Sequence, residues 1–561
     1  MKPLSLLRLA TSFATLVLAG NGNAQTTWQG WGGSILNNHW ASDNRELDSA
    51  SISSLSLQCK IPDSAGQSAA PAIHGDFAYY PTHNGSFISL NYRTCQVRWN
   101  INVTQILVDF KPITPLQAIA NSAISRTSPQ IDGESKLVYF GTQIHALLVA
   151  ADLDSGAVLG VQQVNPHELA TITASPTFYD GLVFVGVSSG EENAAFFTGG
   201  AYPCCSFIGN AAAFRFQRTT RTDTTTAGTF TTVWNVTTIP TNLPPSNGSL
   251  QWSGAAIWGS QPSIDVRRRQ VFFGTGNIYS VPEEYFPCTD SPDKHCFPSY
   301  IWQESVLALD MHTGRANWVR RLDRLDAWTL VCGTPTLPRN NTLCPFTPGT
   351  DADFGMAPTL ILSSSSSPGF NSNTPDGRDI VTVGQKSGVL YALAADTGAV
   401  QWSVLTSPGD ALAGLSWGVA ADDRRVYYTG INNSQQKWVL QPGNATQVNN
   451  SVIGAASARD GRLLWQVAVP SGELSVVVPA VVGDLLLTGA TGPYGVPAGF
   501  PSPGPGTLMA LRKETGEVVW SYQLEGNFQS AIAVQGEYVF LGTGYKGATG
   551  GAFWVFKLEA S

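Results

Sequence analysis

The chain has 561 residues, of which 43% are hydrophobic and 13% charged, and its formal net charge at pH 7 is −8. These values exclude an intrinsically disordered chain, and because no lysine- or arginine-rich cluster stands out, we expect no nucleic-acid partner. The 56 glycines, 34 prolines and 16 tryptophans indicate many turns and short strands, and a large β fold of this length is built from repeats.

Residues 1–24 have the pattern of a secretory signal peptide. Basic residues precede an apolar run at 9–19, and the small residues Gly22 and Ala24 lead to a cleavage site after Ala24. The alternative is a membrane anchor, but the run is shorter than the ~20 residues that a membrane span needs. No later segment is apolar enough to span, so we expect a secreted, extracellular protein.

Sequons of the form N-x-S/T are frequent in the rest of the chain. After a signal peptide, so many sequons indicate a glycosylated protein of a eukaryotic secretory pathway. The expected glycosylation sites are Asn84, Asn102, Asn235, Asn247, Asn340, Asn432, Asn444 and Asn449.

The eight cysteines fall into local pairs, and an oxidising compartment lets them form disulfides. Many connectivities are open to eight cysteines. Pairing nearest neighbours joins Cys59 to Cys95, Cys204 to Cys205, Cys288 to Cys296 and Cys332 to Cys344. No C-x-x-C or H-x-x-x-H spacing supports zinc, and no C-x-x-C-H supports a c-type haem.

One phrase recurs along the chain: an apolar strand, a turn resembling D-T-G, and a second strand that ends in tryptophan. Aspartate and glycine suit the turn, because aspartate bonds its own backbone and glycine accepts a positive φ. Another strand precedes each phrase, which makes about four strands per unit, as in the blades of a β-propeller. The phrases end at Trp318, Trp402, Trp465 and Trp520, with weaker copies ending at Trp99, Leu159 and Trp234.

An eighth strand pair lies at the end of the chain, in GAFWVFKLEA. We expect it to pair with a strand from the segment 46–60, because joining the chain ends closes the ring and leaves no open edge. The predicted fold class is therefore all-β: one eight-bladed β-propeller over residues 25–561, with long loops on one face. An array of β-sandwiches is the alternative. The recurring tryptophans are expected to fill the space between sheets and not to act in catalysis.

Departures from the repeat are the candidate sites. The longest insertions are 188–209, 276–305 and 323–355, and they contain SSGEE, GTGN, LDAW and DADFG. Glutamate, asparagine and aspartate supply the oxygen ligands that suit calcium. Each acid taken alone is more often a solvated loop carboxylate, so the linear spacing does not establish that they converge.

The order of SSGEE, CCSFIGN, GAAIWGSQPSIDV, FFGTGN, LDAW, DADFG, GQKSGVLYAL and LSWGVAADD resembles the quinoprotein alcohol dehydrogenase family, in particular its polyvinyl-alcohol dehydrogenase branch. The resemblance covers most of the chain after the signal peptide. It implies an eight-bladed propeller that holds pyrroloquinoline quinone (PQQ) and Ca²⁺ and oxidises an alcohol.

The resemblance also implies roles for individual residues. Trp258 would form the floor beneath the quinone, Glu192 and Asn277 would bind calcium, with Glu191 as the alternative to Glu192, and Asp326 would be the base and a further metal ligand. Lys386 and Arg126 would contact the quinone. In such a site the metal polarises the quinone carbonyl, a carboxylate takes the hydroxyl proton, and a flat ring stacks on the planar cofactor.

The adjacent Cys204 and Cys205 match the family's vicinal disulfide, which lies over the quinone. In the methanol-dehydrogenase type these cysteines precede the calcium-binding glutamate, whereas here they follow it. The resemblance thus leaves two interpretations: the pair covers the cofactor, or it braces the loop that carries Glu192. Two reduced or separately paired cysteines are a third.

Three functions follow from these observations. The first is a secreted oxidoreductase that transfers a hydride from a small or polymeric alcohol to PQQ and then passes electrons to an external acceptor. The second is a secreted propeller enzyme that dehydrogenates or cyclises a secondary metabolite without PQQ. The third is a non-catalytic binding scaffold, since propellers also serve in this way.

Overall fold

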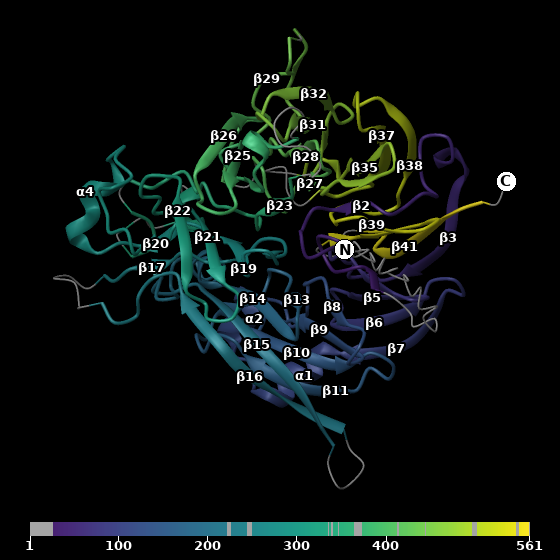
Figure 1. Cartoon of the computed structure of the whole chain (residues 1–561). Coiled ribbons are helices and arrows are strands. Elements are labelled where there is room, and N and C mark those ends of the chain that lie inside the picture. The colour runs from purple at the N-terminus through teal and green to yellow at the C-terminus, as the bar shows by residue number, and fades with distance from the viewer. Residues whose placement is uncertain are drawn as a thin grey trace, which may run out of the picture.

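In the computed structural model of the chain, short antiparallel sheets follow one another around a central axis, like the blades of a propeller (Figure 1). No helix among the described residues is long and apolar enough to cross a membrane. The expected signal peptide at 1–24 and the sequons at Asn247 and Asn444 lie outside the described residues. The structure describes residues 26–220, 226–243, 250–334, 336–337, 340, 342–345, 347–363, 373–411, 414–443, 445–495, 502–545 and 549–559.

The first four blades use strands in chain order, from the axis outwards. Blade 1 contains β4 (Ala72–His74), β5 (Phe77–Pro81), β6 (Ser86–Asn91) and β7 (Gln96–Asn102). Blade 2 contains β8 (Gln130–Asp132), β9 (Leu137–Gly141), β10 (Leu147–Asp152) and β11 (Val158–Gln163). Blade 3 contains β13 (Thr177–Tyr179), β14 (Leu182–Ser189), β15 (Asn210–Thr220) and β16 (Thr226–Thr237), with β12 (Ala170–Thr171) also paired to β14. Blade 4 contains β18 (Ser263–Asp265), β19 (Gln270–Gly274), β21 (Ser305–Asp310) and β22 (Ala316–Arg321).

The other four blades complete the ring. Blade 5 contains β23 (Thr359–Ile361), β24 (Ile380–Gly384), β25 (Val389–Ala394) and β26 (Val400–Leu405). Blade 6 contains β27 (Ala420–Ala421), β28 (Arg425–Gly430), β31 (Val452–Ser457) and β32 (Leu463–Ala468). Blade 7 contains β34 (Ala480–Val482), β35 (Leu485–Ala490), β37 (Thr507–Arg512) and β38 (Val518–Gln523). Blade 8 contains β39 (Ala533–Gln535), β40 (Tyr538–Thr543), β41 (Ala552–Leu558) and β3 (Leu55–Pro62).

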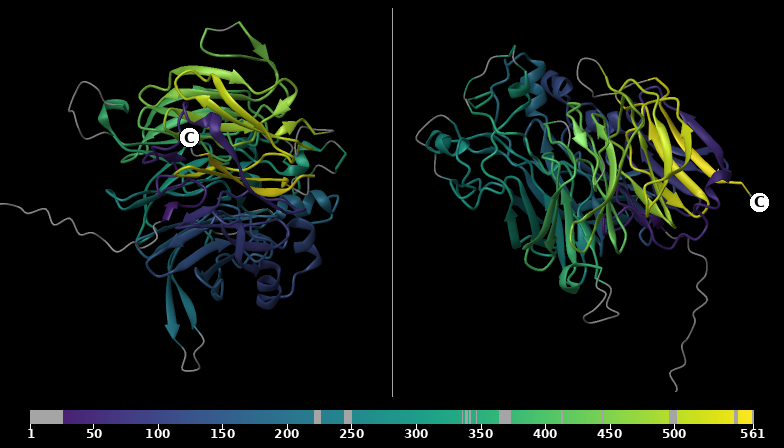
Figure 2. Two further views of the ribbon diagram at one scale, coloured as in Figure 1. Left: turned by 90° about the vertical axis from the view of Figure 1, so that its right-hand side faces the viewer. Right: turned by 90° about the horizontal axis from the view of Figure 1, so that it is seen from above.

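Shorter elements decorate this ring, and in two further views the β15–β16 hairpin projects from it (Figure 2). The helices are α1 (Val103–Phe110), α2 (Pro115–Ala120), α3 (Glu191–Phe197) and α4 (Phe286–Thr289), with 3₁₀ turns η1 (Ile52–Ser54), η2 (Glu283–Tyr285), η3 (Leu330–Gly333) and η4 (Pro375–Gly377). Two-stranded ladders join β17 (Ser253–Gly254) to β20 (Ile278–Ser280), β29 (Trp438–Val439) to β30 (Gln447–Val448), and β33 (Glu473–Leu474) to β36 (Gly492–Pro493).

The hydrophobic core lies between neighbouring sheets. Phe87 of blade 1 stacks on Phe140 of blade 2, with ring centroids 4.3 Å apart, and both side chains are fully buried. Strands that are buried on both faces have nearly continuous apolar sequences, such as Leu137–Gly141 in β9. The predicted eight-bladed, all-β propeller is confirmed.

Five of the recurring tryptophans each join a blade to the next. Trp402 of blade 5 donates its indole N–H to the carbonyl of Ala458 in blade 6, at 3.0 Å, and its ring covers Gly461 of the same turn. Gly461 has a φ of +71°, and an added Cβ would lie 2.6 Å from the ring. The same contact joins Trp99 to Gly156, Trp234 to Gly314, Trp318 to Gly398 and Trp465 to Gly516. The tryptophan and the turn glycine of the repeat are therefore the two halves of one contact between blades.

The two ends of the described chain meet in blade 8. β3 pairs antiparallel with β41 along its length, from Leu55 opposite Leu558 to Pro62 opposite Ala552. Figure 1 shows the purple β3 beside the yellow β41. A disulfide between Cys59 and Cys95 then ties β3 to the β6–β7 turn of blade 1. All four disulfides join the cysteines that are nearest in sequence, as predicted.

A segment before β3 runs along the inner edges of the blades. It begins with β1 (Thr26–Trp28) on blade 1 and ends with β2 (Trp40–Ala41), which adds a parallel strand to β34 of blade 7. Between them, the carbonyls of Ile35, Leu36, Asn38 and His39 accept hydrogen bonds from the innermost strands of blades 4, 5, 6 and 7 in turn, from Ile264, Leu360, Ala421 and Val481. The sequence analysis did not predict this inner ring.

The sequons differ in their accessibility. Asn432 is 1% exposed and its side-chain amide donates to the carbonyl of Gln436 at 2.8 Å, so it is not available for glycosylation in the folded protein. This burial argues against the site predicted at Asn432. The exposed sequon asparagines among the described residues are Asn84, Asn102, Asn235, Asn340 and Asn449, where glycosylation stays a prediction.

Candidate functional site

A cavity of about 250 Å³ lies where connections from several blades meet at one end of the sheets. It is lined by Glu192, which belongs to α3 just after β14, by Asn277 between β19 and β20, and by Lys386 just after β24. Connections that lead into the next blade add more of its wall. They contribute Arg126, Trp258, Asp353 and Trp417.

Asp353 has the most polar contacts of these residues. Its Oδ1 accepts the backbone N–H of Asn277 at 2.6 Å, and its Oδ2 accepts the indole N–H of Trp258 at 2.9 Å. The ammonium of Lys386 lies 3.0 Å from the same Oδ2 and 2.9 Å from Oδ2 of Asp351. Burial acts to lower the pKa of Lys386, but Asp351 and Asp353 outweigh it, so the net pKa is raised and the ammonium stays charged.

Glu192 is the second carboxylate on the cavity. Its Oε1 is buried and has no hydrogen-bond partner among the described residues. Burial, followed by the charge of Asp353, raises the pKa of Glu192 to about 8. A buried carboxyl oxygen without a partner is costly, and a cation at this point would remove that cost.

Asn277 presents its side-chain oxygen to the same region. Its amide nitrogen donates to the carbonyl of Trp328 at 2.6 Å and to that of Ile278 at 3.2 Å, which leaves Oδ1 for another partner. No three His, Cys, Asp or Glu side chains form a metal-binding group in the part of the chain that the structure describes. The oxygen donors here are instead two carboxylates and one amide, and oxygen donors of these kinds suit Ca²⁺. The residues therefore fit a calcium ion by their chemistry.

Two tryptophans give the cavity its flat surfaces. The rings of Trp258 and Trp417 meet edge to face, with centroids 5.5 Å apart and an interplanar angle of 78°. The ammonium of Lys386 lies 5.2 Å from the ring of Trp258, and the guanidinium of Arg126 lies 5.6 Å from that of Trp417. An aromatic plane beside two cations suits a planar, anionic cofactor.

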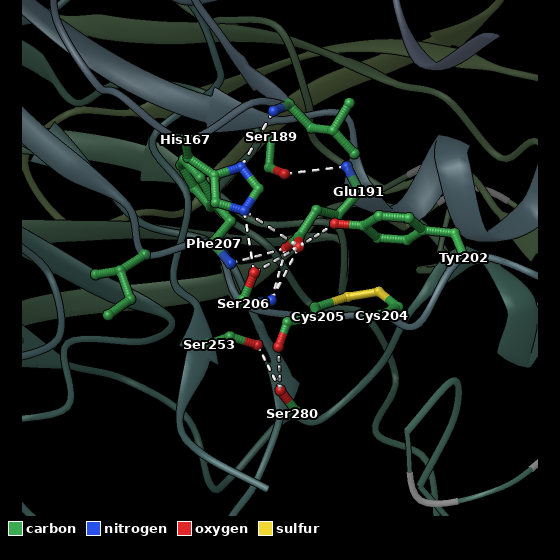
Figure 3. Close-up of polar contacts among 12 residues, drawn as sticks. His167, Ser189, Glu191, Tyr202, Cys204, Cys205, Ser206, Phe207, Ser253 and Ser280 are labelled. Atoms are coloured by element: carbon green, nitrogen blue, oxygen red, sulfur yellow. Dashed lines mark hydrogen bonds and ion pairs between the residues drawn. A yellow bond between two sulfur atoms is a disulfide. The ribbon is translucent and has the colours of Figure 1, made fainter. Parts of the chain in front are cut away.

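Glu191, whose polar contacts Figure 3 shows, has a different role from its neighbour Glu192. It is fully buried, and its carboxylate accepts the hydroxyl of Tyr202 at 2.8 Å and the backbone N–H groups of Ser206 and Phe207, each at 2.9 Å. Burial acts to raise the pKa of Glu191, but His167 and these N–H groups outweigh it and the pKa is lowered. Glu191 thus anchors the loop 202–207 to α3, and it does not line the cavity.

His167 and Ser206 do not form a hydrolytic triad with Glu191. The backbone N–H of Leu169 donates to Nδ1 of His167, so Nε2 carries the proton. That Nε2 lies 3.1 Å from Oγ of Ser206 and 3.4 Å from the Glu191 carboxylate. To act as a base towards the Ser206 hydroxyl, His167 would need a free lone pair on Nε2, and in this tautomer Nε2 carries a hydrogen instead. The His167, Ser206 and Glu191 contacts are therefore structural.

The vicinal disulfide Cys204–Cys205 lies in the loop that Glu191 anchors (Figure 3). Cys204 packs with Ala195 of α3 and with Val331 and Leu343, the residues just before Cys332 and Cys344 of another disulfide. Neither cysteine of the vicinal pair is among the residues that line the cavity. These contacts favour the interpretation that the pair braces the loop beside Glu192 over the interpretation that it covers the cofactor.

Asp326 also lies outside the lining of the cavity. Its carboxylate is 3% exposed and accepts the backbone N–H of Asp351 at 3.2 Å and that of Ala352 at 2.7 Å. Both carboxylate oxygens are therefore bonded to the backbone just before Asp353. The position of Asp326 outside the lining argues against the base and metal-ligand roles predicted for it, and Asp353 of the same insertion lines the cavity instead.

The comparisons with known proteins agree with this architecture. A family model described as outer membrane protein assembly factor BamB matches residues 449–559. Two curated relatives named polyvinylalcohol dehydrogenase, from Pseudomonas sp. and Sphingopyxis sp. (strain 113P3), are 26% and 28% identical over 450 and 456 residues. Each alignment covers 79% of this chain but only 59% of the relative, so the chain spans about three-fifths of the length of these relatives.

Solved structures extend the likeness to nearly the whole chain. The quinohemoprotein alcohol dehydrogenases of Comamonas testosteroni and Pseudomonas putida HK5 match it with TM-scores of 0.64 and 0.65, at 14% and 15% identity. The matches cover 97% and 95% of this chain and 82% and 81% of those chains. The chain has the quinoprotein alcohol dehydrogenase-like fold. The resemblance predicted from the sequence, including that to polyvinyl-alcohol dehydrogenases, is confirmed.

The quinoprotein-like propeller brings together Glu192, Asn277, Trp258, Lys386 and Arg126 of the predicted site residues. Asp353 and Trp417 also line the cavity but were not among the predicted site residues, although the motifs DADFG and LSWGVAADD contain them. The signal that could have found Asp353 was its position in the long insertion just before β23.

Proposed function

We propose that this chain is a secreted oxidoreductase that oxidises an alcohol group and uses PQQ and Ca²⁺. The observation that carries the proposal is the cavity in which Glu192, Asn277 and Asp353 place oxygen donors beside the ring of Trp258 and the ammonium of Lys386. The likeness to relatives named polyvinylalcohol dehydrogenase supports an alcohol as substrate, small or polymeric, and an external electron acceptor.

In this proposal Glu192 and Asn277 hold the calcium ion, with Asp353 beside them. Trp258 lies against the planar cofactor, and Lys386 and Arg126 supply positive charge at its rim. PQQ, when bound, supplies the acceptor for the hydride that leaves the carbinol carbon.

Asp353 is the proposed base, in place of Asp326. A carboxylate oxygen of Asp353 takes the proton of the substrate hydroxyl as the C–H bond breaks and the carbonyl forms. The indole of Trp258 and the backbone N–H of Asn277 fix the orientation of that carboxylate before substrate arrives. Lys386 balances its negative charge.

The test is a titration of the purified protein with PQQ in the presence and absence of Ca²⁺, followed by tryptophan fluorescence. We expect saturable, calcium-dependent quenching for the wild type. Glu192→Gln should weaken binding by about tenfold or more, because it removes a charged metal ligand. Glu134→Gln, at an exposed position outside the cavity, is the matched control and should bind as the wild type does.

Turnover separates binding from chemistry. With an artificial electron acceptor, a panel of alcohols, and saturating PQQ and Ca²⁺, Asp353→Asn should lose about 10²–10⁴-fold in kcat. Absence of any saturable quenching by the wild type would refute the use of PQQ. It would leave a secreted propeller that acts on a metabolite without this cofactor, or a binding scaffold.

A further inference from the structure

The segment that carries Asp353 is irregular. Residues 351–358 form no helix or strand, and the described backbone bonds of Asp353 and Phe354 come from other segments: Lys386 N–H to the Asp353 carbonyl at 3.1 Å and Phe354 N–H to the Thr275 carbonyl at 3.4 Å. Asp351 has a φ of +57°, in the left-handed region that few residues adopt. The position of the Asp353 carboxylate therefore depends both on its own bonds to Asn277 and Trp258 and on what holds the backbone just before it.

Asp326 holds the backbone just before Asp353. One of its oxygens accepts the N–H of Asp351 and the other accepts the N–H of Ala352, two consecutive amides directly before Asp353. The loop crosses the carboxylate so closely that a Cβ on Gly349 would lie 1.8 Å from Oδ1 of Asp326. The N–H of Gly349 also donates to the carbonyl of Ala327, the residue after Asp326, at 2.8 Å, so the loop is bonded to this segment at a third point.

Asp326 is itself joined to the other wall of the cavity. Its N–H donates to Oε1 of Gln303 at 2.9 Å, and its carbonyl accepts the N–H of Ile278 at 2.9 Å. Ile278 follows Asn277, the proposed metal ligand. One buried residue thus joins the segment that presents Asn277 to the loop that presents Asp353, in addition to the direct bond from the Asn277 N–H to Asp353.

We propose that Asp326 is a positioning residue: its carboxylate holds the loop 349–353 so that Asp353 faces the cavity at the correct distance from Asn277. The inference rests on the proposed function for what Asp353 does there. The contact itself does not depend on that function. Replacing the Asp326 carboxylate by an amide tests the contact directly. Asparagine keeps one oxygen for one N–H and turns an NH₂ donor towards the other N–H, so one of the two bonds to the loop is lost.

The experiment compares Asp326→Asn with the wild type by hydrogen–deuterium exchange and by steady-state kinetics. We expect the peptide that contains residues 349–354 to exchange about tenfold faster or more, while the blade strands keep their protection. We expect kcat to fall by about 10- to 100-fold with KM within about threefold, because a shift of the base by about 1 Å is enough for such a loss.

Asp422→Asn is the matched control. Asp422 is also 3% exposed and also accepts two consecutive backbone amides, those of Arg424 and Arg425, but it lies in blade 6 away from the cavity. Both amides bond the same Oδ1, which asparagine keeps, so this variant removes a buried carboxylate without releasing a backbone amide. It should leave exchange at residues 349–354 unchanged and kcat within about twofold of the wild type. Gly349→Ala, which pushes the loop away from Asp326, should reproduce the effects of Asp326→Asn and serves if that variant does not fold.

The outcomes are distinct. Unchanged exchange at 349–354 in Asp326→Asn, or an unchanged kcat, would overturn the proposal, as would an equal loss of kcat in Asp422→Asn. If the wild type binds no PQQ, the proposed function fails, and the exchange of residues 349–354 still decides whether Asp326 holds the loop.

Discussion

His39 is a buried histidine whose two ring nitrogens have no hydrogen-bond partner among the described residues. Its ring lies near that of Trp31, edge to face, at a centroid distance of 6.2 Å, within the inner ring of the N-terminal segment. Burial lowers the pKa of His39 from 6.5 to about 3. The imidazole is therefore neutral in the folded protein at every pH at which the chain is expected to work.

This burial predicts acid sensitivity. Between pH 6.5 and about 3 the unfolded chain binds a proton at His39 and the folded chain does not, so stability falls as pH falls through that window. The loss is about 1.4 kcal/mol per pH unit, or about 2 kcal/mol between pH 6.5 and 5. The urea midpoint, measured at pH 7.5 and 5.0, should drop more for the wild type than for His39→Asn.

The exposed His312 provides the control for this prediction. His312→Asn should show the same drop as the wild type. If His39→Asn loses as much stability between the two pH values as the wild type does, then the burial of His39 does not contribute to the acid sensitivity.

At the scale of elements, the contact between a tryptophan and the next blade's turn glycine explains why the repeat contains both residues. The glycine supplies a positive φ for the turn, and its missing Cβ leaves room for the neighbouring ring. The indole N–H then satisfies a carbonyl at the start of the same turn. The hairpin motif of one blade thereby also contains the residues that pack it against the hairpin of the next blade.

Gly461→Ala tests this contact. The added methyl group would lie 2.6 Å from the ring of Trp402 and would also strain a φ of +71°, so we expect a loss of about 2–4 kcal/mol and a lower Tm. Gly536→Ala is matched for backbone strain, since its φ is +53° and nothing lies within 4 Å of its Cβ position. The difference in Tm between the two variants isolates the tryptophan contact, and equal Tm values would show that it contributes nothing.

The whole molecule depends on closing the ring. β41 lies between β40 and β3, and the Cys59–Cys95 disulfide ties this last blade to the first. In the chain-entropy account a disulfide stabilises by restricting the unfolded chain, and the effect grows with the length of the loop it closes. The Cys59–Cys95 loop spans a sequence separation of 36, and the Cys288–Cys296 loop only 8.

We therefore expect the double variant Cys59→Ser/Cys95→Ser to lose about 4 kcal/mol, and Cys288→Ser/Cys296→Ser about 2–3 kcal/mol. Thermal unfolding followed by tryptophan fluorescence measures the difference. A larger drop in Tm for the second pair would contradict the view that the first disulfide secures the closure of the ring.

The sequence by itself determined the blades and the blade-to-blade role of the tryptophans. Each of these depends on residues close together in the chain: a hairpin needs its turn residues at fixed spacing, and a repeat needs only its own period. The resemblance also placed five residues in one region, because each lies in a motif that matches a site motif of the family. They are Glu192, Asn277, Trp258, Lys386 and Arg126.

Only the tertiary structure decided which acid does what. Glu191 and Glu192 are neighbours on α3, and a helix turns by about 100° per residue, so one points to the disulfide loop and the other to the cavity. Asp326 and Asp353 lie in the same long insertion, and the path of the loop over Gly349 decides which of them faces the cavity. Such choices depend on contacts between segments of blades 3, 4 and 5 that lie far apart in the sequence, and no local pattern in the sequence predicts them.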